Sequence, residues 1–211
     1  MLVGILDLGI NNLTSVQKGF SAALELNDKI VVIDEGEKEE RPDLLIMPGL
    51  GKFAAGMMAL HERNLVEKIR NWSLQGTKVV GICLGMQLLG AQSEESPGVE
   101  GLNLINSTVR RLPIEVSERI PHIGWAEVIK SSHSKHFPSL KSQGDFYFVH
   151  SFHLLPTNET EILTTTPFGK SIFVSSVLSG NILGVQFHPE KSGAKGKSLI
   201  SEIVQWVRDE S

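Results

Sequence analysis

Short runs of hydrophobic residues alternate with amphipathic stretches in the first half of the chain. The runs have the length of buried strands and cover residues 2–6, 30–33, 44–47 and 79–82. Between them, apolar residues from Leu13 to Leu24 recur at helical spacing, and residues 65–75 form a second amphipathic stretch. Apolar strands that alternate with helices predict a mainly parallel sheet covered by helices on both faces.

The second half of the chain has strand-like runs with few helical patterns between them. These runs cover residues 109–112, 126–129, 146–152, 172–178 and 182–187. Strands that follow one another without long crossovers pair as hairpins, so we expect antiparallel extensions of the sheet. A last helix is predicted over residues 198–207. No linker or repeat divides the sequence, and we predict one domain over residues 1–211.

The composition indicates a chain with a substantial core and no nucleic-acid surface. Of its 211 residues 41% are hydrophobic, and the net charge is −4. No run reaches the ~18 apolar residues of a membrane span, and the first residues form a strand pattern instead of a signal peptide. A single cysteine excludes an internal disulfide, so we expect a cytoplasmic protein.

That cysteine, Cys83, stands where a predicted strand turns into a helix. It follows Val79-Val80-Gly81-Ile82 and precedes Leu84-Gly85-Met86-Gln87. Small residues around such a turn are typical of a nucleophile elbow, which points one side chain into a cleft. A helix N-terminus and a nearby imidazolium favour the reactive thiolate form. Without the flanking glycines, a small buried hydrophobic residue would be the better interpretation.

The predicted strand 182–187 ends in His188-Pro189-Glu190. Residues two apart at a strand end can point the same way, so Glu190 can reach the ring of His188. A nucleophile, a base and a carboxylate that orients the base are the parts of a catalytic triad. The alternative is a histidine in a turn beside a proline, followed by an exposed glutamate.

The segment Pro48-Gly49-Leu50-Gly51 closes the predicted strand 44–47. Sites in open parallel sheets lie at the carboxyl ends of the strands, which would bring this segment close to Cys83. The backbone N–H groups of Gly49, Leu50 and Gly51, together with that of Leu84, could then form an oxyanion hole. An ordinary type II turn is the alternative.

Two other kinds of site are not supported by the sequence. Residues 193–198 end like a phosphate-binding loop, but Lys191 replaces the first glycine of that motif, and we interpret the segment as a loop and helix start. Histidines and carboxylates show no spacing typical of metal ligands. We therefore predict neither a metal nor a cofactor.

The segments around Cys83 and His188 resemble the class I glutamine amidotransferases, and residues 48–51 resemble that family's oxyanion strand. Further segments are similar to the glutaminase subunits of imidazole glycerol phosphate synthase: Pro121-His122-Ile123-Gly124-Trp125, Tyr147-Phe148-Val149-His150-Ser151 and Pro189-Glu190-Lys191-Ser192-Gly193. The resemblance runs nearly end to end and implies a flavodoxin-like sheet.

The resemblance implies an enzymatic reaction. Cys83 would attack the side-chain amide of glutamine, and His188, oriented by Glu190, would carry a proton to the departing ammonia. A thioester would form, and water would release glutamate. By the same resemblance, the backbone of the bound glutamine would be held by Gln87, Ser151 and Phe152.

The resemblance also implies a partner. Ammonia would pass to a (β/α)₈-barrel synthase subunit in a heterodimer that makes imidazole glycerol phosphate for histidine biosynthesis. Residues that match the family's contacts with the synthase are Asn12, His122, Trp125 and Lys191. Ordinary structural roles for three of these are a helix cap for Asn12, a core indole for Trp125 and a solvated lysine for Lys191.

Two other functions remain open from the sequence. One is a paralogous amidotransferase subunit that feeds ammonia to a different synthase, for example one that amidates surface sugars. The other is a non-catalytic binding subunit on the same fold, although the complete set of Cys83, His188 and Glu190 favours an enzyme.

Overall fold

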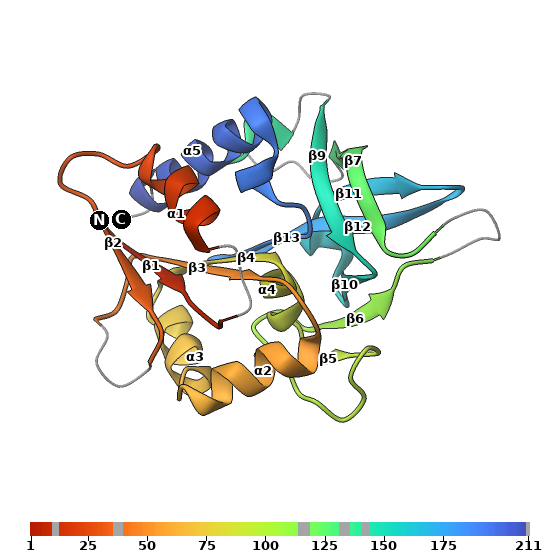
Figure 1. Cartoon of the computed structure of the whole chain (residues 1–211), viewed down its shortest axis with the longest axis horizontal. Coiled ribbons are helices and arrows are strands. Elements are labelled where there is room, and N and C mark those ends of the chain that lie inside the picture. Colours follow the sequence, from red (N-terminus) through yellow and green to blue (C-terminus); the bar gives the residue numbers. More distant parts are fainter. Residues whose placement is uncertain (10–12, 36–39, 114–118, 131–135, 141–143, 210–211) are drawn as a thin grey trace.

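The computed structural model describes residues 1–9, 13–35, 40–113, 119–130, 136–140 and 144–209. Its centre is a sheet of eight strands in the order β2-β1-β3-β4-β13-β12-β11-β8 (Figure 1). Their bounds are β1 Leu2–Leu6, β2 Lys29–Ile33, β3 Leu44–Gly49, β4 Lys78–Cys83, β8 Ile129–Lys130, β11 Ile162–Phe168, β12 Ser171–Ser179 and β13 Ile182–Val185.

Strands β2, β1, β3, β4 and β13 are parallel to their neighbours in this order, whereas β12, β11 and β8 continue the sheet with antiparallel pairing. Two smaller sheets lie beside it. One contains β10 Phe152–Pro156, β6 Ser107–Arg111 and β5 Gln92–Ser93, and the other pairs β7 His122–Glu127 with β9 Asp145–His150. The predicted parallel sheet with antiparallel extensions is confirmed.

Helices cover both faces of the central sheet (Figure 1). On one face, α1 Leu13–Ser21 and α5 Gly193–Asp209 bury side chains such as Phe20 and Ile203 in one core cluster. On the other face, α2 Phe53–Glu62, α3 Val66–Leu74 and α4 Leu84–Leu88 bury a second cluster that includes Phe53 and Ile69. The strands are apolar on both sides because each side faces a helix layer.

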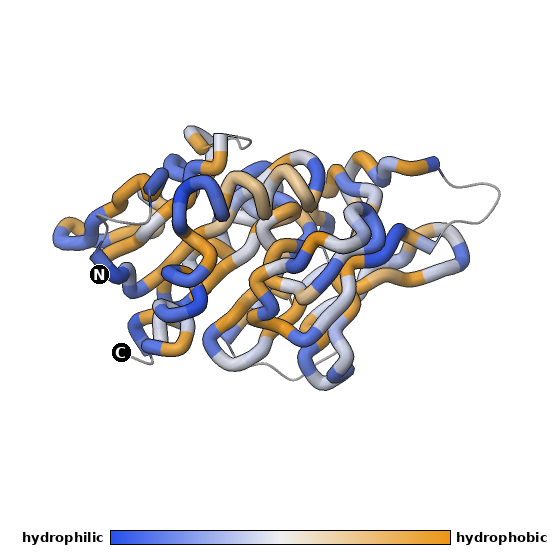
Figure 2. Tube along the Cα trace, turned by 90° about the horizontal axis from the view of Figure 1, so that it is seen from below, coloured by the Kyte–Doolittle hydropathy of each residue, from blue (hydrophilic) through white to orange (hydrophobic). Residues whose placement is uncertain are grey.

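Hydrophobic and hydrophilic stretches alternate over short distances along the trace (Figure 2). Such alternation is expected of elements that each bury one face and expose the other. Within the described ranges, no helix combines the length and the apolar character needed to cross a bilayer.

Several elements differ from the sequence prediction. The helix expected after Cys83 is only the short α4, which ends at Leu88, because the carbonyl groups of residues 88–90 accept hydrogen bonds from the backbone of residues 102–104. Helix α2 was not predicted, since its sequence is apolar nearly all round and shows no helical alternation. Helix α5 begins at Gly193, five residues before the predicted start at 198.

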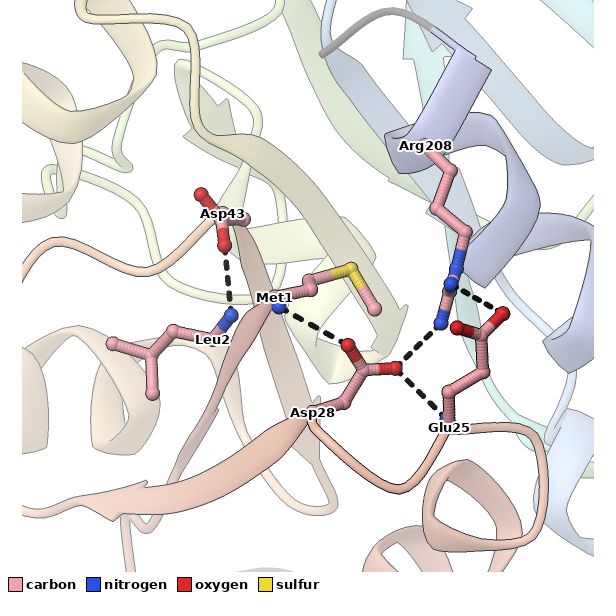
Figure 3. A network of polar contacts seen from close by, with 6 residues as sticks. All are labelled: Met1, Leu2, Glu25, Asp28, Asp43 and Arg208. Atoms are coloured by element: carbon pink, nitrogen blue, oxygen red, sulfur yellow. Dashed lines mark hydrogen bonds and ion pairs between the residues drawn. The ribbon is translucent and has the colours of Figure 1, made fainter.

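A network of charges fastens the C-terminal end of α5 to the edge of the sheet (Figure 3). Asp28 accepts hydrogen bonds from the backbone N–H of Glu25, the ammonium group of Met1 and the guanidinium of Arg208. These donors, with the Glu25 N–H contributing most, lower the pKa of Asp28 below its ordinary value of 3.8. Arg208 also pairs with Glu25, so one cation holds two carboxylates.

Two glycines let α4 pack directly on the backbone of the sheet. A Cβ atom on Gly85 would lie 1.7 Å from the carbonyl oxygen of Met47 in β3, and one on Gly81 would lie 2.6 Å from the backbone of Gly85. No side-chain movement can relieve either overlap, because both partners are main-chain atoms. The flanking glycines of the elbow are therefore required by packing.

We predict that Gly85→Ala destabilises the protein by at least about 3 kcal/mol, because α4 must move away from β3 to make room for the methyl group. Urea unfolding measures the change. Gly180→Ala is the matched control: its Cβ would meet no atom within 4 Å, and its φ of +56° should cost only about 1 kcal/mol. Equal losses in the two variants would contradict the packing argument.

Candidate active site

Cys83 lies at the junction of β4 and α4 in a strained backbone conformation. Its φ of 55° and ψ of −109° are rare for a residue with a side chain, and such strain is concentrated at functional sites. The thiol is 4% exposed. Its Sγ lies 3.7 Å from the carbonyl oxygen of Val149, to which it can donate, and accepts a hydrogen bond from Nε2 of Gln186 at 3.6 Å. This is the geometry expected of a nucleophile elbow.

His188 and Glu190 form a buried pair beyond the end of β13. Nδ1 of His188 lies 2.8 Å from Oε1 of Glu190, and both side chains are almost fully buried. A short 3₁₀ turn, η3 Pro189–Lys191, begins immediately after His188 and presents the carboxylate to the ring. The exposed glutamate that the alternative interpretation required is not found.

Neighbouring groups control the protonation of His188. Burial alone lowers its pKa, but interactions with Cys83 and Glu190 outweigh burial and raise the pKa from 6.5 to about 9. Because Nδ1 is bonded to Glu190, the ring atom that interacts with Cys83 is Nε2. Nε2 is buried and forms no hydrogen bond to any described residue, so it is the ring atom that remains available to the thiol.

A cleft of about 190 Å³ opens beside the sulfur. Seven residues expected at the site line it: Leu50, Gly51, Cys83, Leu84, Gln87, Ser151 and Phe152. Gly49 does not line the cleft. It packs behind it, and a Cβ at this position would lie 3.0 Å from the Cβ of Leu84. The structure thus brings together segments from β3, β4, α4 and the β9–β10 corner around the thiol.

Four further residues line the cleft: Pro121, Val149 and His150, which belong to segments that resemble the family but were given no role, and Glu95, which the sequence did not single out. Glu95 is the only acidic residue among the described residues that line it. Oε2 of Glu95 accepts a hydrogen bond from the backbone N–H of Phe53 at 2.8 Å, so the carboxylate also caps the start of α2. In the sequence it stands in a polar loop, where no pattern distinguishes it from a solvated glutamate.

The far wall of the cleft is fixed from behind. The carbonyl oxygen of Phe152 accepts a hydrogen bond from Nε2 of Gln87 at 2.9 Å and another from Nδ1 of His150, also at 2.9 Å. The carbonyl oxygen of Ser151 accepts from the backbone N–H of Leu112. These hydrogen bonds hold the Ser151–Phe152 corner in place beside the cleft.

The four residues expected at a partner interface differ in position. Trp125 is 55% exposed on β7, which excludes a core indole, and the ammonium of Lys191 lies 5.9 Å from the ring centroid of Tyr147. His122 is half-buried and stacks on Phe148, with ring centroids 5.1 Å apart. Asn12 lies outside the described residues. Across the described parts of the chain, no three His, Cys, Asp or Glu side chains are placed to hold a metal ion.

The fold and the site define a class. The profile of the family "Glutamine amidotransferase class-I" matches residues 8–205, and the chain belongs to this family. Its relatives include the "Imidazole glycerol phosphate synthase subunit HisH" of Thermotoga maritima, 39% identical over 97% of each chain. The protein of the same description from Pyrococcus furiosus is 41% identical over 94% of this chain and 95% of that relative.

Solved structures support the same fold. "Structure of PurLQS from Thermotoga maritima" superposes with a TM-score of 0.72 over 98% of both chains at 16% identity. "Crystal structure of glutamine amidotransferase" gives a TM-score of 0.71 over 98% of both chains at 20% identity. At these identities the likeness concerns the fold alone.

Burial lowers the pKa of His150 from 6.5 to about 3. The unfolded chain binds the proton near pH 6.5, so His150 costs no stability above that pH, and stability falls progressively as the pH drops from 6.5 towards 3. We predict that His150→Phe reduces the slope of unfolding free energy against pH in this window by up to about 1.4 kcal/mol per unit. Urea unfolding between pH 7.5 and 5 measures it; an unchanged slope would contradict the prediction.

Proposed function

We propose that the chain is a glutaminase subunit that hydrolyses glutamine and supplies ammonia to a synthase subunit making imidazole glycerol phosphate in histidine biosynthesis. The observation that carries this proposal is the buried His188–Glu190 pair next to the strained Cys83. Membership of the glutamine amidotransferase family and the descriptions of relatives at 39–41% identity support the choice of substrate and pathway.

The proposed chemistry begins with proton transfer from the Cys83 thiol to Nε2 of His188. The thiolate then attacks the side-chain amide carbon of glutamine, forming an S–C bond and a tetrahedral oxyanion. His188 returns the proton to the amide nitrogen, the C–N bond breaks, and ammonia leaves. Water, activated by His188, cleaves the resulting thioester to give glutamate and the free thiol.

Backbone N–H groups stabilise the oxyanion in this proposal. Leu50, Gly51 and Leu84 line the cleft with the sulfur, and Gly49 supports Leu84 from behind. Removing one donor from such a hole typically costs ~100–1,000-fold in rate. The positive φ of Gly51, +118°, gives this segment a conformation that residues with side chains rarely adopt.

The cleft suits a small amino acid. Its volume of about 190 Å³ is below the ~300–1,000 Å³ of typical drug-sized ligand pockets. We assign Glu95 to the α-ammonium group of glutamine, because it is the acidic residue among the described residues of the cleft. In this proposal Ser151 and the N–H groups of the Ser151–Phe152 corner bind the remaining polar atoms of glutamine, and Gln87 holds that corner in place.

We predict that Glu190→Gln lowers kcat for glutamine hydrolysis by about 100–10,000-fold, because the imidazole loses the carboxylate that fixes its tautomer. The pKa of His188, followed by NMR of the ring, should fall, since Glu190 contributes to raising it. Glu159→Gln, at an exposed site in the turn Glu159–Glu161, is the control and should change neither quantity. Full activity in Glu190→Gln would exclude the assigned role.

The face that carries β7 is the proposed docking surface for the synthase. Ile123 and Trp125 project from it and are 60% and 55% exposed. Such apolar side chains in alternate positions of a strand mark an interaction surface more often than a solvated one. We propose that a (β/α)₈-barrel synthase subunit covers this face in a heterodimer and meets Lys191 at its edge, with His122 behind the face and Asn12 as a further expected contact.

We predict that Cys83→Ala, in complex with the histidine-pathway synthase, abolishes glutamine-dependent synthesis but leaves synthesis from added ammonium salts intact. The reason is that only ammonia production needs the thiol. The assay follows imidazole glycerol phosphate with either nitrogen source. Loss of both activities would indicate that Cys83 is structural.

Glutaminase assays with and without the barrel subunit and its nucleotide test the choice of partner. We expect slow hydrolysis by the isolated chain and stimulation by the histidine-pathway synthase with its ligand. Stimulation only by a synthase acting on an amino sugar would favour the paralogous amidotransferase, and full activity of the isolated chain would favour a free-standing hydrolase.

A further inference from the structure

We propose that Gln186 stabilises the thiolate of Cys83 by donating a hydrogen bond to its sulfur. A chain of buried hydrogen bonds fixes which end of the Gln186 amide faces the sulfur. The proposal deepens the function proposed above and rests on it for the reaction. The hydrogen bonds from which it is argued do not depend on the proposed function. Gln186 opens the segment Gln186-Phe187-His188-Pro189-Glu190, and the sequence analysis gave it no role.

Gln186 is fully buried beside the sulfur. Its side chain is 0% exposed, and its backbone N–H is held by the carbonyl of Ser175 in β12. A buried amide is costly unless its polar atoms are bonded. The Gln186 amide meets this requirement with two partners: Oε1 lies 3.2 Å from Nε2 of Gln87, and Nε2 lies 3.6 Å from Sγ of Cys83.

The direction of this chain follows from one carbonyl group. The carbonyl oxygen of Phe152 can only accept, so the Gln87 atom 2.9 Å away must be the nitrogen. The same nitrogen donates its second hydrogen to Gln186, whose facing atom must then be the oxygen. The other end of the Gln186 amide is therefore the NH₂ group, and it points a donor at the sulfur.

His150 strengthens the same anchor. Its Nδ1 donates to the Phe152 carbonyl, so that oxygen accepts two hydrogen bonds, one from His150 and one from Gln87. Nε2 of His150 is then an acceptor and lies 3.2 Å from Nδ1 of His122, which must donate. The polar chain thus runs from His122 behind the docking face, through the wall of the cleft, to the nucleophile.

A donor at the sulfur has different effects on the two forms of the thiol. In the neutral form, the thiol can donate to the Val149 carbonyl, 3.7 Å away. Once the sulfur is ionised, that carbonyl no longer stabilises it, whereas the Gln186 donor becomes charge-assisted and stronger. Gln186 consequently favours the attacking form and limits where the sulfur can point.

The ionisable groups around Cys83 do not supply this interaction. His188, bonded to Glu190, interacts with Cys83, and Glu95 and His150 line the cleft. The two carboxylates disfavour a thiolate, whereas protonated His188 favours it to an extent that depends on pH. Gln186 is neutral, so its contribution is a fixed dipole that does not change with pH.

The test uses the single cysteine of the chain, since alkylation by iodoacetamide then reports on one thiol. Gln186→Met keeps the side-chain length but removes the donor. We expect it to raise the pH at the midpoint of the alkylation-rate profile by about one unit, which corresponds to a tenfold loss of thiolate at pH values below the midpoint. Gln87→Met should give a smaller rise, because Gln186 remains but its direction is no longer fixed.

Gln205→Met is the matched control, since Gln205 lies exposed on α5 and bonds only Asp209 among the contacts that the structure describes for it. It should alkylate like the wild type. If folded Gln186→Met shows an unchanged midpoint, the proposal is overturned. Alkylation needs no glutamine turnover, so the two proposals can fail separately. If the wild-type complex does not hydrolyse glutamine but Gln186→Met still shifts the alkylation midpoint, the glutaminase function is refuted and the role of Gln186 stands.

NMR of the unmodified protein decides the question if Gln186→Met fails to fold. The side-chain amide protons of Gln186 should move downfield as the thiol ionises, and this movement should be absent in Cys83→Ser, whose hydroxyl does not ionise in the same range. An amide signal with the same pH dependence in both proteins would overturn the proposal.

Discussion

The close approach of α4 to the backbone of β3 is the constraint on which the site depends. Without a side chain at Gly85, the helix lies against the Met47 carbonyl, and the chain must turn so sharply at the end of β4 that Cys83 takes a positive φ. That turn places the sulfur between the Val149 carbonyl and the Gln186 amide, within reach of the His188 ring. Packing energy from two hydrophobic clusters sustains the strain at Cys83.

Strand order then brings the remaining groups to the same point. β4 lies between β3 and β13. The Gly49–Gly51 segment lies at the carboxyl end of β3, Cys83 at that of β4, and His188 shortly after that of β13. The register pairs Val185 with Ile82, and the residues that follow each strand therefore face one another. This is the general location of sites in open α/β sheets.

Much of this arrangement could be predicted from the sequence, because it is encoded locally. The apolar runs gave the parallel strands, and the glycines around Cys83 indicated the turn. The role of Glu95 could not be predicted, since it depends on a loop that folds back to cap α2, which itself has too uniform an apolar pattern to be recognised. Gln186 was missed for a similar reason: its neighbours, Gln87 and Cys83, are about a hundred residues away in the chain.

The turn that follows β13 carries two kinds of residue at once. His188 immediately precedes it, and Lys191, at the edge of the proposed docking surface, ends it. Strand β9 binds both ends of this turn through Tyr147. The Tyr147 carbonyl accepts a hydrogen bond from the His188 N–H, and the Tyr147 N–H donates one to the Ser192 hydroxyl. The other edge of β9 pairs with β7, which bears Trp125. The outer face is consequently joined to the backbone of His188 through β7, β9 and one main-chain hydrogen bond, while the Ser192 hydroxyl fastens the far end of the turn to the same strand.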